Sequence, residues 1–133
     1  MDPLSAAASI IAVLQLSGKV LGYLNDVKSA SKDRSKCAIE VANLNSLLTA
    51  LRFHLEESSS TPWYTAAKTL AVENGPLDQF KQALEELHTK MVGKDKMSDT
   101  LAWKFKKEEI ASILNRMERL KTLVEVALQM DHL

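Results

Sequence analysis

The stretch CAIEVANLNSLLTALRFHL, residues 37–55, decides the fold class. Its apolar side chains recur at spacings of 3 and 4, which place them on one face of an α-helix. The same spacing returns in the segments 77–91 and 110–128. The chain holds only 4 Gly and 3 Pro, too few for the many turns of an all-β sandwich. The sequence therefore predicts an all-α protein.

Composition narrows the class of protein further. The chain has 133 residues, 46% of them apolar, which suits a single domain with one core over residues 1–133. Lys plus Arg number 17 and Asp plus Glu number 17, so the chain lacks the basic excess of a general nucleic-acid binder. We expect no nucleic-acid partner. A single cysteine, Cys37, excludes an intramolecular disulfide and a multi-cysteine zinc site.

Two breaks divide the chain into helices. Ser58 to Pro62 is the first break, and Asn74-Gly75-Pro76 is the second. Four long helices are predicted near 3–24, 37–57, 77–92 and 110–128, with a short helix over 61–72 between the second and third. Short connections favour an up-down-up-down four-helix bundle. The middles of three stripes predict the core, namely Leu44, Leu48, Leu84, Leu87, Met117 and Leu120.

The N-terminal helix, about 3–24, is apolar on nearly all sides. One stripe runs through Leu4, Ala7, Ile11, Leu14, Gly18 and Leu21, and a second through Ile10, Val13, Ser17, Val20 and Leu24. Such a helix is either buried in a bundle or placed in a membrane. A helix over 4–24 is about 32 Å long, close to the hydrocarbon thickness of a bilayer. No basic segment precedes it, which argues against a secretory signal, so we expect a cytoplasmic protein.

The spacing Gly18-x-x-x-Gly22 has two interpretations. Small residues four apart let helices approach closely in lipid, and they also allow close packing in a soluble core. In the folded state we expect this helix to be the most enclosed of the bundle. In the active state we expect it to meet lipid or other copies of itself. The residues predicted for that contact are Leu4, Ile10, Ile11, Leu14, Gly18, Val20, Leu21 and Gly22.

The placement of charges predicts a molecule with zero net charge that has one positively charged end and one negatively charged end. In an up-down-up-down bundle the segments 25–36 and 90–107 share one end, and they carry net charges of +2 and +4. The opposite end sums to −6. A basic end can sit on anionic lipid, although charged loops are also ordinary in soluble proteins. The predicted lipid contacts are Lys28, Lys32, Arg34, Lys36, Lys94, Lys96, Lys104, Lys106 and Lys107.

No set of residues predicts catalysis. The histidines His54, His88 and His132 lie in different elements, and none has a metal-ligating partner at helical spacing. Cys37 lies on a core stripe, so we expect an inert thiol. No phosphate-binding glycine loop is present in the sequence. We expect no enzyme activity, no cofactor and no metal.

The opening MDPLSAAASIIAVLQL, residues 1–16, resembles the N-terminal HeLo-like domain of fungal STAND proteins, the NOD-like receptors of fungi. A second match is LAWKFKKEEI, residues 101–110, followed by MERL at 117–120 and Ala127-Leu128. Family members often have Pro where this chain has Lys104 and Leu where it has Met117. These departures affect where the last helix starts.

The resemblance implies a signalling or effector module that precedes nucleotide-binding and repeat domains in a longer receptor. Related HeLo domains are membrane-targeting executioners of programmed cell death, similar in kind to the four-helix bundle of the necroptosis executioner. The implied partners are other copies of the chain, the downstream domains and an anionic membrane. Recruitment to the plasma membrane is then expected. The alternative is an interaction or autoinhibitory module whose first helix stays in place.

Overall fold

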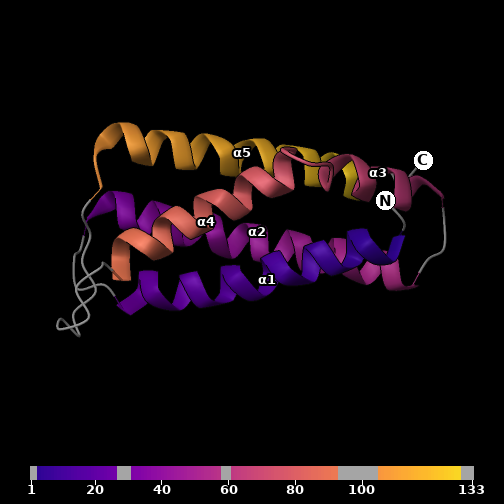
Figure 1. Cartoon of the computed structure of the whole chain (residues 1–133), viewed down its shortest axis with the longest axis horizontal. Coiled ribbons are helices and arrows are strands. Elements are labelled where there is room, and N and C mark those ends of the chain that lie inside the picture. Colours follow the sequence, from indigo (N-terminus) through magenta and orange to yellow (C-terminus); the bar gives the residue numbers. More distant parts are fainter. Residues whose placement is uncertain (1–2, 27–30, 58–60, 93–104, 130–133) are drawn as a thin grey trace.

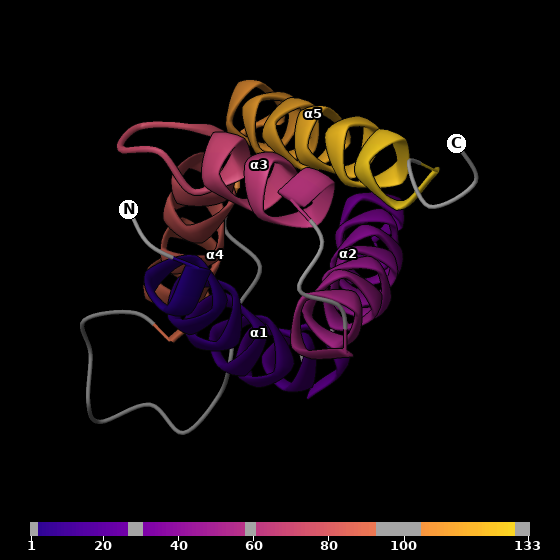
Figure 2. The ribbon, with the colours of Figure 1, turned by 90° about the vertical axis from the view of Figure 1, so that its right-hand side faces the viewer.

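The computed structural model describes residues 3–26, 31–57, 61–92 and 105–129. In this part of the chain the regular structure is entirely helical, as predicted. The helices are α1 (Pro3–Asp26), α2 (Lys32–Glu57), α3 (Thr61–Leu70), α4 (Pro76–Val92) and α5 (Lys107–Gln129). The four long helices lie side by side, and α3 crosses one end (Figures 1 and 2).

The core is built from the predicted stripes. All six residues predicted for it are fully buried: Leu44, Leu48, Leu84, Leu87, Met117 and Leu120. Phe80 of α4 is the largest fully buried side chain among the described residues. The α2 stripe from Cys37 to Leu55 is buried along its whole length. The spacing of 3 and 4 therefore identified the inner face of these helices correctly.

Helix ends are fixed by local hydrogen bonds. The Ser31 hydroxyl accepts from the Arg34 amide at 3.2 Å and caps α2. The Lys106 amide donates to Glu109 Oε1 at 2.9 Å and begins α5. Before α4, Asn74 has a φ of 61°, and a Cβ on Gly75 would lie 2.6 Å from the Val72 side chain. The predicted break at 74–76 is thus a tight turn that needs glycine.

The four long helices do not pack against one another in the order in which they follow along the chain. Helix α1 packs on α2 and α4, and α5 packs on α2 and α4. Chain direction alternates along the four long helices, so the neighbours α1 and α4 run the same way (Figure 1). The reason is α3, which contacts α1, α2 and α5 and carries the chain across the end of the molecule from α2 to α4 (Figure 2).

Candidate functional site

The inner face of α1 is its second apolar stripe. Ala6, Ile10, Val13, Val20 and Leu24 are buried there, and so is Ser17. In the first stripe Ala7, Ile11, Leu14 and Leu21 are half-buried, and Gly18 is exposed. A glycine turned inward would leave a void in the core, whereas the branched side chains of the second stripe fill it.

Two contacts fix the orientation of α1. Asn45 Nδ2 of α2 donates to Ser17 Oγ at 2.7 Å, and the Ser17 hydroxyl donates to the Leu14 carbonyl at 2.9 Å. The rings of Tyr23 and His88 lie 5.2 Å apart between α1 and α4. Because α2 and α4 hold the helix from both flanks, its remaining side faces away from the core.

That remaining side is the outward face of α1, and it consists of small and uncharged residues around one lysine. Its members are all exposed: Ala8, Ala12, Gln15, Gly18, Lys19 and Gly22. A Cβ built on Gly18 or Gly22 would meet nothing within 4 Å. The interpretation that these glycines serve close packing in the core is therefore wrong.

The residues predicted for membrane contact fall on different sides of α1. Ile10 and Val20 point into the core and are 1% and 0% exposed. Gly18 and Gly22 lie on the outward face. Ile11, Leu14 and Leu21 are half-buried between them, and the Leu4 side chain lies outside the described residues.

The expectation that α1 is the most enclosed helix is also wrong. Six of its residues 6–26 are buried, against seven of the shorter stretch 76–91 in α4. Helix α1 is long and apolar enough to cross a bilayer over Ala6–Asp26, yet only 28% of its apolar window is buried. Core helices of soluble proteins and signal sequences also meet that length and composition test, but core helices are mostly buried. Helices α2 and α5 bury six residues each over 26 and 23 residues, so α1 differs from them in its apolar composition and not in the share of residues buried.

The predicted basic end is present in part. Among the described residues it comprises Lys32, Arg34, Lys36, Lys106 and Lys107, where α2 and α5 begin and α1 and α4 end (Figure 1). The four lysines of this set are exposed. Arg34 is half-buried and its Nη1 donates to the Leu24 carbonyl at 2.9 Å, so it caps α1. Four further predicted contacts lie outside the described residues: Lys28, Lys94, Lys96 and Lys104.

The sequence-based estimate of charge at this end was too high. It stopped at residue 107, yet Glu108 and Glu109 belong to the first turn of α5 at the same end. Glu109 also pairs with Lys90, whose Nζ lies 5.5 Å from the centroid of the Phe105 ring. The basic end therefore remains positive but weaker than the predicted +6.

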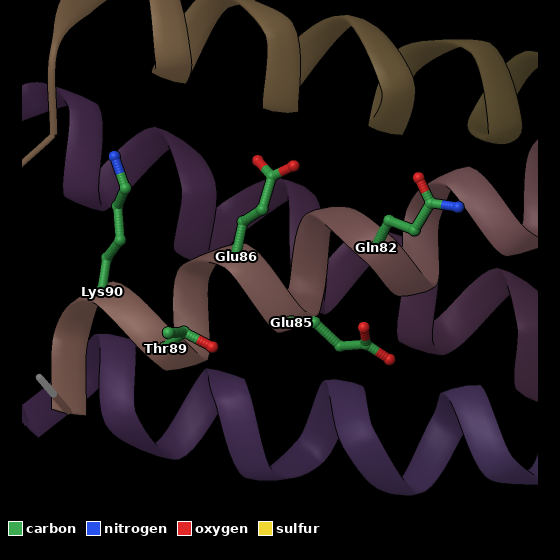
Figure 3. Close-up of a pocket in the computed structure, with 5 residues that line it drawn as sticks. All are labelled: Gln82, Glu85, Glu86, Thr89 and Lys90. Carbon is green, nitrogen blue, oxygen red and sulfur yellow. The ribbon is translucent and has the colours of Figure 1, made fainter. Parts of the chain in front are cut away.

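Catalytic geometry is not found among the described residues. No group of three His, Cys, Asp or Glu residues could hold a metal ion there. A shallow hollow on α4 is lined by side chains of that helix alone (Figure 3): Gln82, Glu85, Glu86, Thr89 and Lys90. Glu86 and Lys90 point toward α5, where Arg116 and Glu109 bind them. These groups hold helices together.

Cys37 is buried, and its environment makes the thiol inert. Burial, with a smaller contribution from the nearby Asp33 carboxylate, raises the pKa of Cys37 from 9.0 to about 11. The reactive thiolate is therefore scarce at neutral pH. The prediction of a buried core cysteine is consistent with this environment.

Sequence reasoning missed exposed apolar residues on α2. Ile39 and Phe53 are each 59% exposed. They are fourteen residues apart, which places them on the same side of the helix. The uncharged run 41–51 between them was a signal that could have drawn attention to this side of α2.

Comparisons with known proteins give little about function. No protein-family model matches the chain, and no solved structure matches it. A DNA ligase of Bacillus pumilus (strain SAFR-032) is 46% identical over 57 residues. The match covers 41% of this chain and 8% of that ligase, and so small a share carries no conclusion about enzyme activity.

Proposed function

We propose that this chain is a non-enzymatic signalling and effector domain of a fungal NOD-like receptor, with its four long helices forming an up-down-up-down bundle. It acts in cell death or incompatibility by oligomerisation-driven membrane targeting through α1. The observation that supports this proposal best is the composition of α1, because Ala6–Asp26 is long and apolar enough for a bilayer although only 28% of its apolar window is buried. The ligase match covers too little of either protein to support a ligase function.

The arrangement of charges suggests how targeting proceeds. Exposed Lys32, Lys36, Lys106 and Lys107 lie at the end where α1 finishes. Each lysine near an anionic membrane contributes about 1 kcal/mol of attraction. The protein stays cytoplasmic until neighbouring receptor domains bring copies together, and these lysines then orient it on the plasma membrane.

Release of α1 follows as the second step. Because α1 is joined to α2 at the basic end, its N-terminal part is the part that moves. In the middle of α1 the hydrogen bond to α2 is neutral, from Asn45 to Ser17, whereas the Arg34 guanidinium holds the C-terminal end at the Leu24 carbonyl. The rings of Tyr23 and His88 make a further contact, between α1 and α4. Lys19 is the one cation of α1, and its long stem lets the ammonium group reach the headgroup region.

The alternative is an interaction module in which α1 stays in place. Ile39 and Phe53, about 21 Å apart along one side of α2, are the large apolar side chains of this helix that a partner would cover. The two functions differ in whether α1 leaves α2 and α4.

Leakage from dye-loaded vesicles tests the proposal. The chain, fused to a domain that dimerises on addition of a small molecule, should release dye from anionic vesicles after dimerisation. Gly18→Leu with Gly22→Leu should retain the fold, because both positions open to solvent, and should reduce leakage by blocking close helix approach. Thr122→Leu on the exposed side of α5 is the matched control and should leak like the parent.

Circular dichroism and thermal melting establish that each variant is folded. Equal leakage from the parent and the folded double variant would contradict a close-packed α1 assembly. An oligomerised parent that leaves both anionic and neutral vesicles intact would contradict membrane targeting altogether and favour the interaction module.

Charge reversal tests the orientation step. Lys106→Glu with Lys107→Glu should weaken binding to anionic vesicles and reduce its salt sensitivity. Arg119→Glu with Lys68→Glu, at exposed positions away from this end, makes the same change in net charge and is the matched control. Equal binding of the parent to anionic and neutral vesicles would rule out a role for the basic end.

A further inference from the structure

Helix α1 carries two charged residues, and both are exposed. Lys19 lies on the outward face, and Asp26 is the last residue of the helix. They are seven residues apart, which places them on the same side at about 10 Å along the axis. Gly22 lies midway between them on that side, where a Cβ would meet open space.

Asp26 has an unfavourable position within one copy of the chain. A carboxylate at a helix C-terminus faces the negative end of the helix dipole. The last turn of α1 contains no basic residue. Within one copy Arg34 of α2 already lies at this end, bound to the Leu24 carbonyl, and a second cation beside the exposed Asp26 carboxylate would add to the attraction.

We propose that the outward face of α1 binds the same face of a second copy of this chain, in antiparallel orientation. The two-fold axis passes beside Gly22. Lys19 of each copy then faces Asp26 of the other copy, and two opposite-charge contacts flank the centre. The absence of side chains at Gly22 lets the two backbones approach closely at the axis.

Charge complementarity selects this orientation and this occupant. A parallel pairing would place Lys19 against Lys19 and Asp26 against Asp26, which is unfavourable at both positions. With the axis beside Gly22, the paired stretch runs from Lys19 to Asp26, and Ala8, Ala12 and Gln15 of the outward face lie beyond it. The pairing occurs between folded copies in water. It specifies the self-association of the proposed function but requires no membrane.

A single crossing of two helices covers less surface than a standard stable interface, so the pair is weak and depends on high local concentration. A covalent trap suits such a complex. In a Cys37→Ala background, Gly22→Cys places one thiol per copy beside the axis. Oxidation should give a disulfide-linked dimer, because a bridge needs Cα atoms within about 7 Å.

Ala12→Cys is the matched variant on the same face. In the antiparallel pair its two copies lie about 30 Å apart along the axis, too far to bridge. Thr122→Cys, at an exposed position of α5 outside the proposed interface, gives the rate of cross-linking that random collisions produce. Gly22→Cys should therefore cross-link much faster than both, and all three proteins are checked for folding by circular dichroism.

A charge swap tests the flanking contacts. Within the Gly22→Cys protein, Lys19→Glu or Asp26→Lys should slow cross-linking about tenfold, since each creates two like-charge contacts. Combining the two substitutions restores opposite charges and should restore the rate. Arg119→Glu should leave it unchanged.

Two results would overturn the proposal. Equal cross-linking at Ala12→Cys and Gly22→Cys would indicate a parallel pair, and a rate at Gly22→Cys no higher than at Thr122→Cys would indicate no pair. Failure of the double charge variant to recover would exclude the Lys19–Asp26 contacts. Because no vesicle is present, each result is independent of the leakage assay.

Discussion

Helices α1 and α4 are parallel neighbours with similar inner faces and very different outer faces. Both bury a stripe at spacings of 3 and 4, from Ile10 to Leu24 in α1 and from Leu77 to Met91 in α4. On its exposed side α4 carries charged residues such as Glu85 and Glu86, whereas α1 carries Ala8, Ala12, Gly18 and Gly22. Packing explains both inner faces, and contact with water explains only the outer face of α4.

The attachments of the two helices differ in the same way. Helix α4 is joined to α5 by two ion pairs, of which Arg116–Glu86 is bidentate at 2.8 and 3.2 Å. Helix α1 is joined to α2 by the neutral bond from Asn45 to Ser17 and, at its C-terminal end, by the Arg34 guanidinium at the Leu24 carbonyl. The outward face of α1 carries one charge, Lys19, whereas the exposed side of α4 carries several, so fewer charges must lose water when α1 changes its surroundings. The proposed release of α1 rests on this difference in composition.

The largest expected effect is in the shared core. Phe80→Ala in α4 should lower the free energy of unfolding by roughly 3–5 kcal/mol, because it leaves a large cavity. Phe53→Ala, at a residue 59% exposed on α2, is the matched control and should change it by less than about 0.5 kcal/mol. Urea denaturation measures both. Similar losses for the two would show that the inner and outer faces are misassigned.

A smaller effect is expected at the attachment of α1. Asn45→Ala removes the donor to the buried Ser17 hydroxyl and should cost roughly 1–2 kcal/mol of folding stability. Ser17→Ala in the same protein should recover part of that loss, since no buried hydroxyl then remains. A double-mutant cycle in urea gives the coupling. Additive losses would mean that the bond does not hold α1 to α2.

The smallest effect is expected on the outward face, and it has the opposite sign. Gly22→Ala adds a methyl group into open space within a helix and should raise stability by about 0.5–1 kcal/mol. A chemical denaturation midpoint at higher urea checks this. A loss of stability would show that Gly22 is packed against a neighbour in the folded protein.

Much of the fold could be predicted because strong stripes mark the inner faces of α2, α4 and α5. Two features could not. Helix α1 has two apolar stripes, so periodicity alone does not decide which one faces inward; the bond between Ser17 and Asn45 and the volume of Ile10 and Val20 decide it. The sequence also did not predict which helices pack against each other, because α3 can lead the chain to either side of the bundle.

The residues of the candidate site could be predicted from the sequence, but their exposure and contacts could not. Gly18 and Gly22 were identified as a contact, but their exposure depends on the rotation of α1. Arg34 belongs to the basic end by sequence, yet its guanidinium caps α1 because it lies beside the Leu24 carbonyl. Such roles depend on tertiary neighbours, which spacing along one helix does not reveal.

Hydrogen exchange of the oligomerised chain, with and without anionic vesicles, tests most directly whether α1 leaves its neighbours. In solution the amides of α1 and α4 should both be protected. On vesicles, α1 should gain protection in the bilayer while the faces of α2 and α4 that it covered lose protection. If α1 and α4 keep the same relative protection on vesicles that leak, the release of α1 is contradicted.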